Sequence, residues 1–116
     1  MFAVTLEARP ASGLLVSALI RRVEADGGSA MVIAKGDAVA GAMLLILADR
    51  GVVGAIVDRV WRFDGGHGFE RVGPADPNEP GAAGDYVAKR RRSDPDLWVV
   101  EVDHREAEKI AGEMLL

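Results

Sequence analysis

The segment Ser93–Glu106 places a turn, a strand and the start of a helix in one short run, so it constrains the fold more than any other part of the sequence. Pro95 disfavours the helical conformation at Asp94, and a helix that precedes it must therefore end there. Leu97–Val102 follows as the clearest strand pattern in the chain.

The two sides of this strand differ in polarity. Successive side chains of a strand point to opposite faces. Trp98, Val100 and Val102 therefore share one uncharged face, whereas Glu101 lies on the other. This pattern predicts that Trp98 is buried in the core.

A final helix is predicted after the strand. Asp103 and Glu106 have the spacing of a capping box, in which an N-cap side chain and the third helical residue satisfy each other's backbone N–H groups. The apolar residues that follow recur at helical spacing: Ala107, Ile110, Ala111, Met114 and Leu115.

The N-terminal half predicts a helix followed by strands. A helical period runs from Ser12, a plausible N-cap, to Gly27–Gly28, where glycine favours a stop. Asp49–Gly51 suggests a three-residue hairpin loop with Gly51 in the left-handed region. Strands are expected at 29–35, 39–48, 52–63 and 69–72, with a short edge strand at 2–8 and a short helix at 85–92.

Residues 73–84 interrupt these elements with a stretch rich in proline and glycine and without an apolar period. Ordering such a segment loses backbone entropy without compensating burial. The 32 residues after it are too few to fold alone. We therefore predict a mobile loop at 73–84 within a single domain, residues 1–116.

The elements together predict an α+β fold. We expect a mainly antiparallel sheet of four to five strands, with two or three helices packed mostly on one face. Apolar residues make up 49% of the chain and aromatic residues only 5%, so aliphatic side chains must fill the core.

Composition also bounds the setting of the protein. The chain has no cysteine, which suits the reducing cytoplasm. The start shows no basic segment before an apolar run, so no signal peptide is predicted. The longest apolar run, Ala42–Ala48, is far shorter than the roughly 20 residues of a membrane-spanning helix. We expect a cytoplasmic protein with no membrane partner.

The run Lys89, Arg90, Arg91 and Arg92 is the candidate binding site. Arginine guanidinium groups bind phosphate or carboxylate groups in a bidentate manner. The alternative is a solvated helix end whose cations pair with Asp94 and Asp96. The net charge of −4 argues against a dedicated nucleic-acid binder.

Asp96, Glu101 and His104 are weak candidates for metal ligands, because carboxylate oxygens and imidazole can bind a divalent ion. Asp96 lies about 17 Å along an extended chain from Glu101, however, at about 3.3 Å per residue. Structural roles in a turn and a helix start explain these residues better than a metal site does. We find no catalytic constellation and predict no cofactor.

Several runs resemble one known family: Val16–Arg22, Gly36–Asp37 with Ala40–Ala42, and above all Asp94–Val102. Together they are similar to a small alphaproteobacterial family catalogued as domain of unknown function 1491. The resemblance spans nearly the whole chain from about residue 12. It implies a short bacterial protein of the architecture given above, and it assigns no catalytic residue.

Three hypotheses on function remain open. The first is a non-enzymatic interaction or scaffold module with a protein partner or a second copy of itself, because apolar strand faces exceed what short helices cover. The second is an accessory factor that binds nucleic acid or another anionic ligand through Lys89–Arg92. The third is a small metal-dependent hydrolase that uses Asp96, Glu101 and His104.

Overall fold

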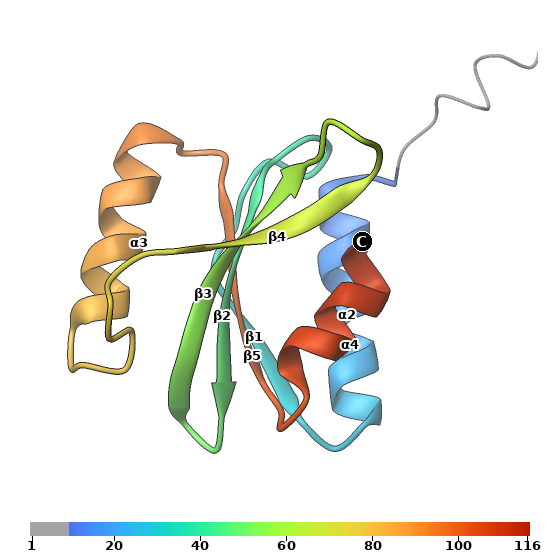
Figure 1. Cartoon of the computed structure of the whole chain (residues 1–116). Coiled ribbons are helices and arrows are strands. Elements are labelled where there is room, and N and C mark those ends of the chain that lie inside the picture. The colour runs from blue at the N-terminus through green and yellow to red at the C-terminus, as the bar shows by residue number, and fades with distance from the viewer. Residues whose placement is uncertain (1–9) are drawn as a thin grey trace, which may run out of the picture.

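The computed structural model describes residues 10–116 (Figure 1). The strand expected at 2–8 lies outside the described residues. The elements are α2 (Ser12–Ala25), β1 (Ser29–Ala34), β2 (Met43–Asp49), β3 (Val52–Trp61), β4 (His67–Val72), α3 (Ala82–Ser93), β5 (Trp98–Asp103) and α4 (Ala107–Leu115).

The strands form one sheet in the order β1-β5-β2-β3-β4. All neighbouring pairs are antiparallel except β2 and β5, which run parallel. The last strand, β5, thus lies inside the sheet between β1 and β2. The predicted α+β class and the mainly antiparallel sheet are confirmed.

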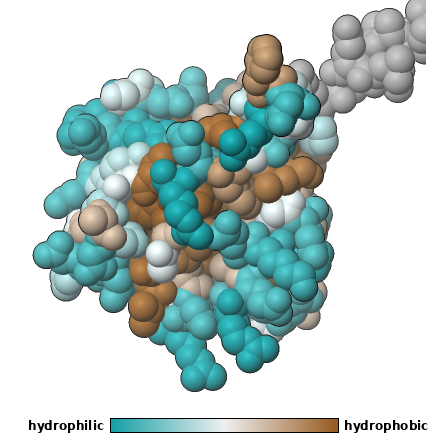
Figure 2. All heavy atoms as spheres, viewed as in Figure 1, coloured by the Kyte–Doolittle hydropathy of each residue, from teal (hydrophilic) through white to brown (hydrophobic). Residues whose placement is uncertain are grey.

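The helices lie on both faces of the sheet. Figure 1 shows α2 and α4 side by side on one face and α3 on the other. The outer surfaces of α3 and α4 are largely hydrophilic in Figure 2, so each helix turns its apolar side toward the sheet. Two of the three helices therefore share a face, as expected.

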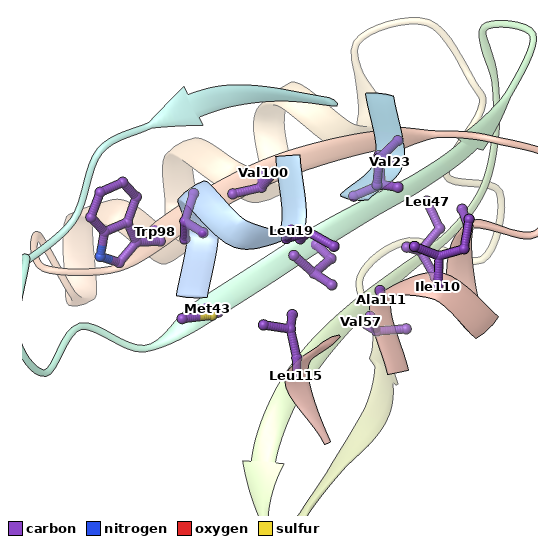
Figure 3. Packing of buried hydrophobic residues seen from close by; sticks show 14 of the residues in the cluster. Leu19, Val23, Met43, Leu47, Val57, Trp98, Val100, Ile110, Ala111 and Leu115 are labelled. Carbon is purple, nitrogen blue, oxygen red and sulfur yellow. The ribbon is translucent and has the colours of Figure 1, made fainter. Parts of the chain in front are cut away.

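The larger part of the core lies between α2, α4 and the sheet (Figure 3). Trp98 is 5% exposed in this cluster, and its indole N–H donates to the carbonyl of Asp37 at 2.7 Å. The predicted burial of Trp98 is confirmed. Its buried neighbours in the cluster include Leu19, Val23, Met43, Leu47, Val57, Val100, Ile110 and Leu115.

A smaller cluster lies under α3. The strands supply Leu44, Ile46, Ile56 and Val99, while the helix adds Val87 with partly buried Ala83 and Tyr86. Because successive strand residues alternate faces, the central strands are apolar on both sides. This double coverage explains why β2 is buried along nearly its whole length.

The helix ends differ from the predicted caps. Ala11, not Ser12, is the N-cap of α2, and the hydroxyl of Ser12 instead donates to the carbonyl of Gly41 at 2.8 Å. The capping box is also wrong, since no side chain caps α4 and Asp103 bonds elsewhere. The stop of α2 is confirmed, because Gly27 has a φ of +88°.

Two turns shorten the strands relative to the prediction. The carboxylate of Asp37 accepts from the N–H groups of Val39 and Ala40, so a turn replaces the first part of the strand expected at 39–48. The hairpin between β2 and β3 has two loop residues rather than three, Arg50 and Gly51. Both have positive φ, of +51° and +80°, as in a type I′ turn.

The proline-rich segment connects β4 to α3, which begins at Ala82 rather than Asp85. In it, Asn78 accepts a hydrogen bond from the N–H of Val53 at 3.0 Å. The mobility of this segment stays a prediction. In the described part of the chain, no helix has the length and apolar character needed to cross a membrane.

Candidate functional site

The predicted basic cluster forms the last turn of α3, and its second residue is fixed by the sheet. The guanidinium of Arg90 donates to both carboxylate oxygens of Asp58 on β3, at 3.0 and 2.9 Å. It also donates to the hydroxyl of Tyr86 at 2.9 Å. The hydrogen bond with Asp58 raises the pKa of Arg90, so this cation is permanently charged and occupied.

Arg91 is fixed by backbone carbonyl groups. Its Nη1 donates to the carbonyl of Leu97 at 2.8 Å, to that of Lys35 at 3.3 Å and also to that of Pro95. These carbonyls belong to the segments that follow β1 and precede β5. Arg91 therefore joins α3 to the neighbouring loops through one nitrogen of its guanidinium group.

The free part of the basic cluster is Lys89 and Arg92. Both are exposed, and neither side chain has an ion pair or hydrogen bond within residues 10–116. The predicted pairing with Asp94 and Asp96 is absent from the described contacts. Asp94 instead accepts from the N–H of Asp96 at 3.1 Å and so closes the turn before β5.

The weak metal candidates do not converge. Asp96 precedes β5 and His104 follows it, so they lie about 25 Å apart at about 3.3 Å per residue. Glu101 points to the α3 face, opposite Val100 and Val102. The ring of His104 accepts from the N–H of Glu106 at 2.8 Å and contacts the carbonyl of Asp26 at 3.2 Å. No group of three potential ligands occurs among residues 10–116.

Among residues 10–116, β1 pairs only with β5, and it forms an apolar and exposed edge of the sheet. The strand has no charged residue from Ser29 to Ala34. Met31, Val32 and Ile33 are 59%, 37% and 44% exposed. On a strand paired at one side only, alternate N–H and C=O groups point away from the sheet and can pair with another chain.

The opposite edge, β4, is protected. The N–H of Arg62 donates to the carbonyl of Gly66 at the start of the β3–β4 ladder. Hydrogen-bonded and non-hydrogen-bonded pairs alternate from there, and Phe69, opposite Arg59, is in a non-hydrogen-bonded pair. The carbonyl of Phe69 therefore points away from β3. The side chain of Arg62 crosses Gly68 and donates to this carbonyl at 3.0 Å. A Cβ at residue 68 would lie 2.0 Å from Nε of Arg62, so only glycine allows this path. β4 also carries Glu70 and Arg71.

Sequence reasoning missed the β1 edge and the partners of Arg90. The uncharged run Ser29–Ala34 was the available signal for an exposed edge, but a buried strand has the same composition. Asp58 lies 32 residues from Arg90, and no local pattern joins them.

Comparison with known proteins identifies relatives of this arrangement. A crystal structure of a DUF1491 family protein from Caulobacter crescentus is 33% identical, with a TM-score of 0.72, and the match covers 86% of this chain and 92% of that one. A solution structure of a protein from A. tumefaciens is 32% identical, with a TM-score of 0.72, over 89% and 92% of the two chains.

No curated protein matches the chain. The family model described as "protein of unknown function (DUF1491)" matches residues 11–112, which include every element from α2 to β5 and most of α4. The expected resemblance is confirmed, and the chain belongs to the DUF1491 family of proteins of unknown function.

Proposed function

We propose that the protein is a non-enzymatic interaction module that pairs through β1 with β1 of a second copy. The observation that carries this proposal is the uncharged edge strand with its three exposed apolar side chains, Met31, Val32 and Ile33. Edge pairing adds main-chain hydrogen bonds and buries these side chains at the same time.

A second copy suits this edge because the strand is self-complementary. A two-fold axis through β1 sets the strand antiparallel to itself and opposes apolar residues to apolar residues. Since Ser29–Ala34 has no charge, no like charges meet across the axis. The protected β4 edge makes β1–β4 pairing between copies a poor alternative.

The size of the edge sets the expected strength. The register of β1 against β5 is irregular between Val32 and Ala34, so only a short stretch is regular enough to pair. Stable complexes usually bury about 1,200–2,000 Å² in total, more than a short strand pair supplies alone. We therefore expect a reversible dimer that forms at high protein concentration.

Sedimentation velocity over a concentration series tests the proposal. The wild-type chain should shift from monomer toward dimer up to about 1 mM, as for weak association. Val32→Lys and Met31→Lys should each keep it monomeric, because pairing would place a charged side chain against apolar residues of the second copy. Val52→Lys is the matched control: Val52 is 57% exposed but lies at the β2–β3 hairpin, so dimerisation should persist.

A wild-type chain that stays monomeric over this range would contradict the proposal. So would a dimer that Val32→Lys and Met31→Lys leave intact. Circular dichroism of each variant separates loss of pairing from loss of folding.

A second candidate function is the binding of an anionic partner by the exposed pair Lys89 and Arg92. It is supported by the absence of any described partner for these two side chains. A Lys89→Gln, Arg92→Gln variant should elute from heparin at lower salt than the wild-type chain, since each lost phosphate or sulfate contact lowers the salt dependence. Equal elution would contradict this role. The hydrolase hypothesis has no such support, because Asp96 and His104 lie at opposite ends of β5.

The proposal places this module in the cytoplasm, which the cysteine-free composition supports. We also propose that residues 1–116 form one domain, in which the part of the proline-rich segment before α3, residues 73–81, is mobile. Hydrogen exchange of the amides in this segment tests its mobility.

A further inference from the structure

Three turns at one end of the sheet enclose a groove of about 680 Å³ that is distinct from the basic turn of α3. In Figure 1 the α2–β1 turn, the β2–β3 hairpin and the β5–α4 turn gather at this end. The groove is lined by Gly27, Gly28, Ser29, Asp49, Arg50, Asp103, His104 and Arg105.

The groove lies where the two parallel strands end. β2 and β5 run in the same direction, and their last residues, Asp49 and Asp103, reach the same edge of the sheet. In open sheets the carboxyl ends of parallel strands are the common place for ligands, because the following loops diverge there. A single parallel pair creates one such place in this fold.

The walls of the groove are tied together. The carboxylate of Asp103 accepts from the N–H groups of Arg50 and Gly51, both at 2.8 Å. His104 bridges the N–H of Glu106 and the carbonyl of Asp26. These bonds fix the three turns relative to one another without a ligand.

Gly28 allows the turns to approach closely. A Cβ at this residue would lie 2.6 Å from the carbonyl oxygen of Asp103 and 2.9 Å from Cδ2 of His104. The α2–β1 turn therefore touches the end of β5 directly, and the groove narrows there.

Two arginines face this fixed frame without partners. Arg50 and Arg105 are exposed, and neither guanidinium has an ion pair or hydrogen bond among residues 10–116. Arg50 also has a φ of +51°, at a loop position where asparagine or glycine is favoured. Asparagine would adopt this positive φ with less strain, so the presence of arginine indicates a functional role for its side chain.

The remaining groups define what the cations can bind. The carboxylate of Asp103 is occupied by backbone N–H groups, while Asp49 is exposed and lines the groove. Two guanidinium groups suit a phosphate, which they bind through paired N–H donors. A carboxylate and the hydroxyl of Ser29 suit hydroxyl groups. The volume exceeds that of a phosphate alone and lies within the usual range for small-molecule sites.

We propose that this groove binds the phosphate ester of a small polyhydroxylated molecule. Arg50 and Arg105 hold the phosphate, and Asp49 and Ser29 hold hydroxyl groups of the remainder. Glu106, Asp26 and Asp103 keep His104 and the hairpin in place and do not touch the ligand.

Amide chemical shifts measured during titration with ribose 5-phosphate test the proposal. The amides of Ser29, Gly51 and Arg105 should shift in a saturable manner, whereas ribose alone should cause no shift. Arg50→Asn and Arg105→Gln should each weaken binding by about tenfold or more, as for a lost charge-assisted hydrogen bond. Arg21→Gln removes an exposed cation on α2, away from the groove, and should leave binding unchanged.

Arg50→Asn has a second expected effect, because asparagine tolerates positive φ better than arginine. Its melting temperature should equal or exceed that of the wild-type chain, so a loss of binding cannot be ascribed to unfolding. The monomeric variant Val32→Lys should still bind, which separates this proposal from the dimer.

Three results would overturn the proposal. One is the absence of a saturable shift up to about 20 mM ribose 5-phosphate, a concentration above the dissociation constant expected of a specific site. Another is unchanged affinity in Arg50→Asn and Arg105→Gln. The third is equal affinity for inorganic phosphate or sulfate, which would reduce the groove to an unspecific anion site.

Discussion

The two faces of the sheet hold their helices by different means. Helices α2 and α4 bury a continuous apolar cluster that contains Trp98, and the part-buried cation of Arg59 on β3 donates to the carbonyl of Leu115 at 2.8 Å. Helix α3 has one buried side chain, Val87, with Ala83 and Tyr86 partly buried beside it, and further attachments of α3 are polar. Arg90 bonds Asp58 on β3, and Arg91 bonds carbonyl groups of the adjoining loops.

This difference assigns a role to the basic run of α3. Apolar burial is not directional and needs many neighbours, whereas a guanidinium fixes a helix through a few oriented bonds. A helix with few apolar residues can thus be held by cations at its end. Local opening is expected to begin where apolar burial is least, so α3 should detach before α2 or α4.

The largest expected effect lies on the α2/α4 face. Trp98→Ala should lower the free energy of unfolding by about 3–5 kcal/mol, as for a large aromatic truncation in a core. Val87→Ala on the α3 face should lower it by about 1.5 kcal/mol, from two buried carbon groups. Urea denaturation of both variants measures this difference. If the two losses are equal, the faces do not differ in the way described.

Removal of the carboxylate under α3 should have an intermediate effect. Asp58→Ala leaves the cation of Arg90 half-buried without its partner, and we expect a loss of about 1–3 kcal/mol. The matched control is Glu108→Ala, which breaks the exposed pair with Arg71 and should cost no more than about 0.5 kcal/mol. Urea denaturation again gives both values.

The double variant Asp58→Ala, Arg90→Met sharpens this test. It removes the unpaired charge along with its partner, so it should recover part of the stability that Asp58→Ala loses. If the double variant loses as much stability as Asp58→Ala and Arg90→Met lose together when each is measured alone, the two side chains are not coupled.

The smallest expected effect is a difference in the hydrogen-exchange rates of backbone amides in the wild-type chain. Amides of the segment 73–81 should exchange with solvent fastest, because it lacks apolar side chains that could anchor it. Amides of α3 should exchange more slowly, and those of α2 and α4 more slowly still. Measured protection in α3 equal to that in α2 would contradict the comparison of the two faces.

Burial patterns could be predicted from the sequence because they repeat over a few residues. The alternation around Trp98 indicated its burial, and Gly27 marked the end of α2. The partners of polar side chains could not be predicted. Asp103 has the spacing of a helix cap, yet it binds a hairpin 53 residues away, because two backbone N–H groups there need an acceptor.

The position of a strand in the sheet was equally hidden. The apolar run of β1 and that of β2 look alike, but β2 is covered on both faces and β1 lies at an edge. Strand order follows from the long-range entry of β5 between β1 and β2. The groove residues Arg50 and Arg105 come together for the same reason. The local signal for this groove in the sequence was Arg50 before Gly51 in the tight turn between β2 and β3.

The bond from Arg62 across Gly68 to the carbonyl of Phe69 has a consequence for assembly. A sheet with two unpaired edge strands can pair with one copy at each edge, so it can add copies without limit. In the proposed dimer, the protected β4 edge opposes the addition of further copies, so we expect association through β1 to end after a single partner. We therefore expect Arg62, on the edge that does not pair, to limit the proposed assembly to two copies.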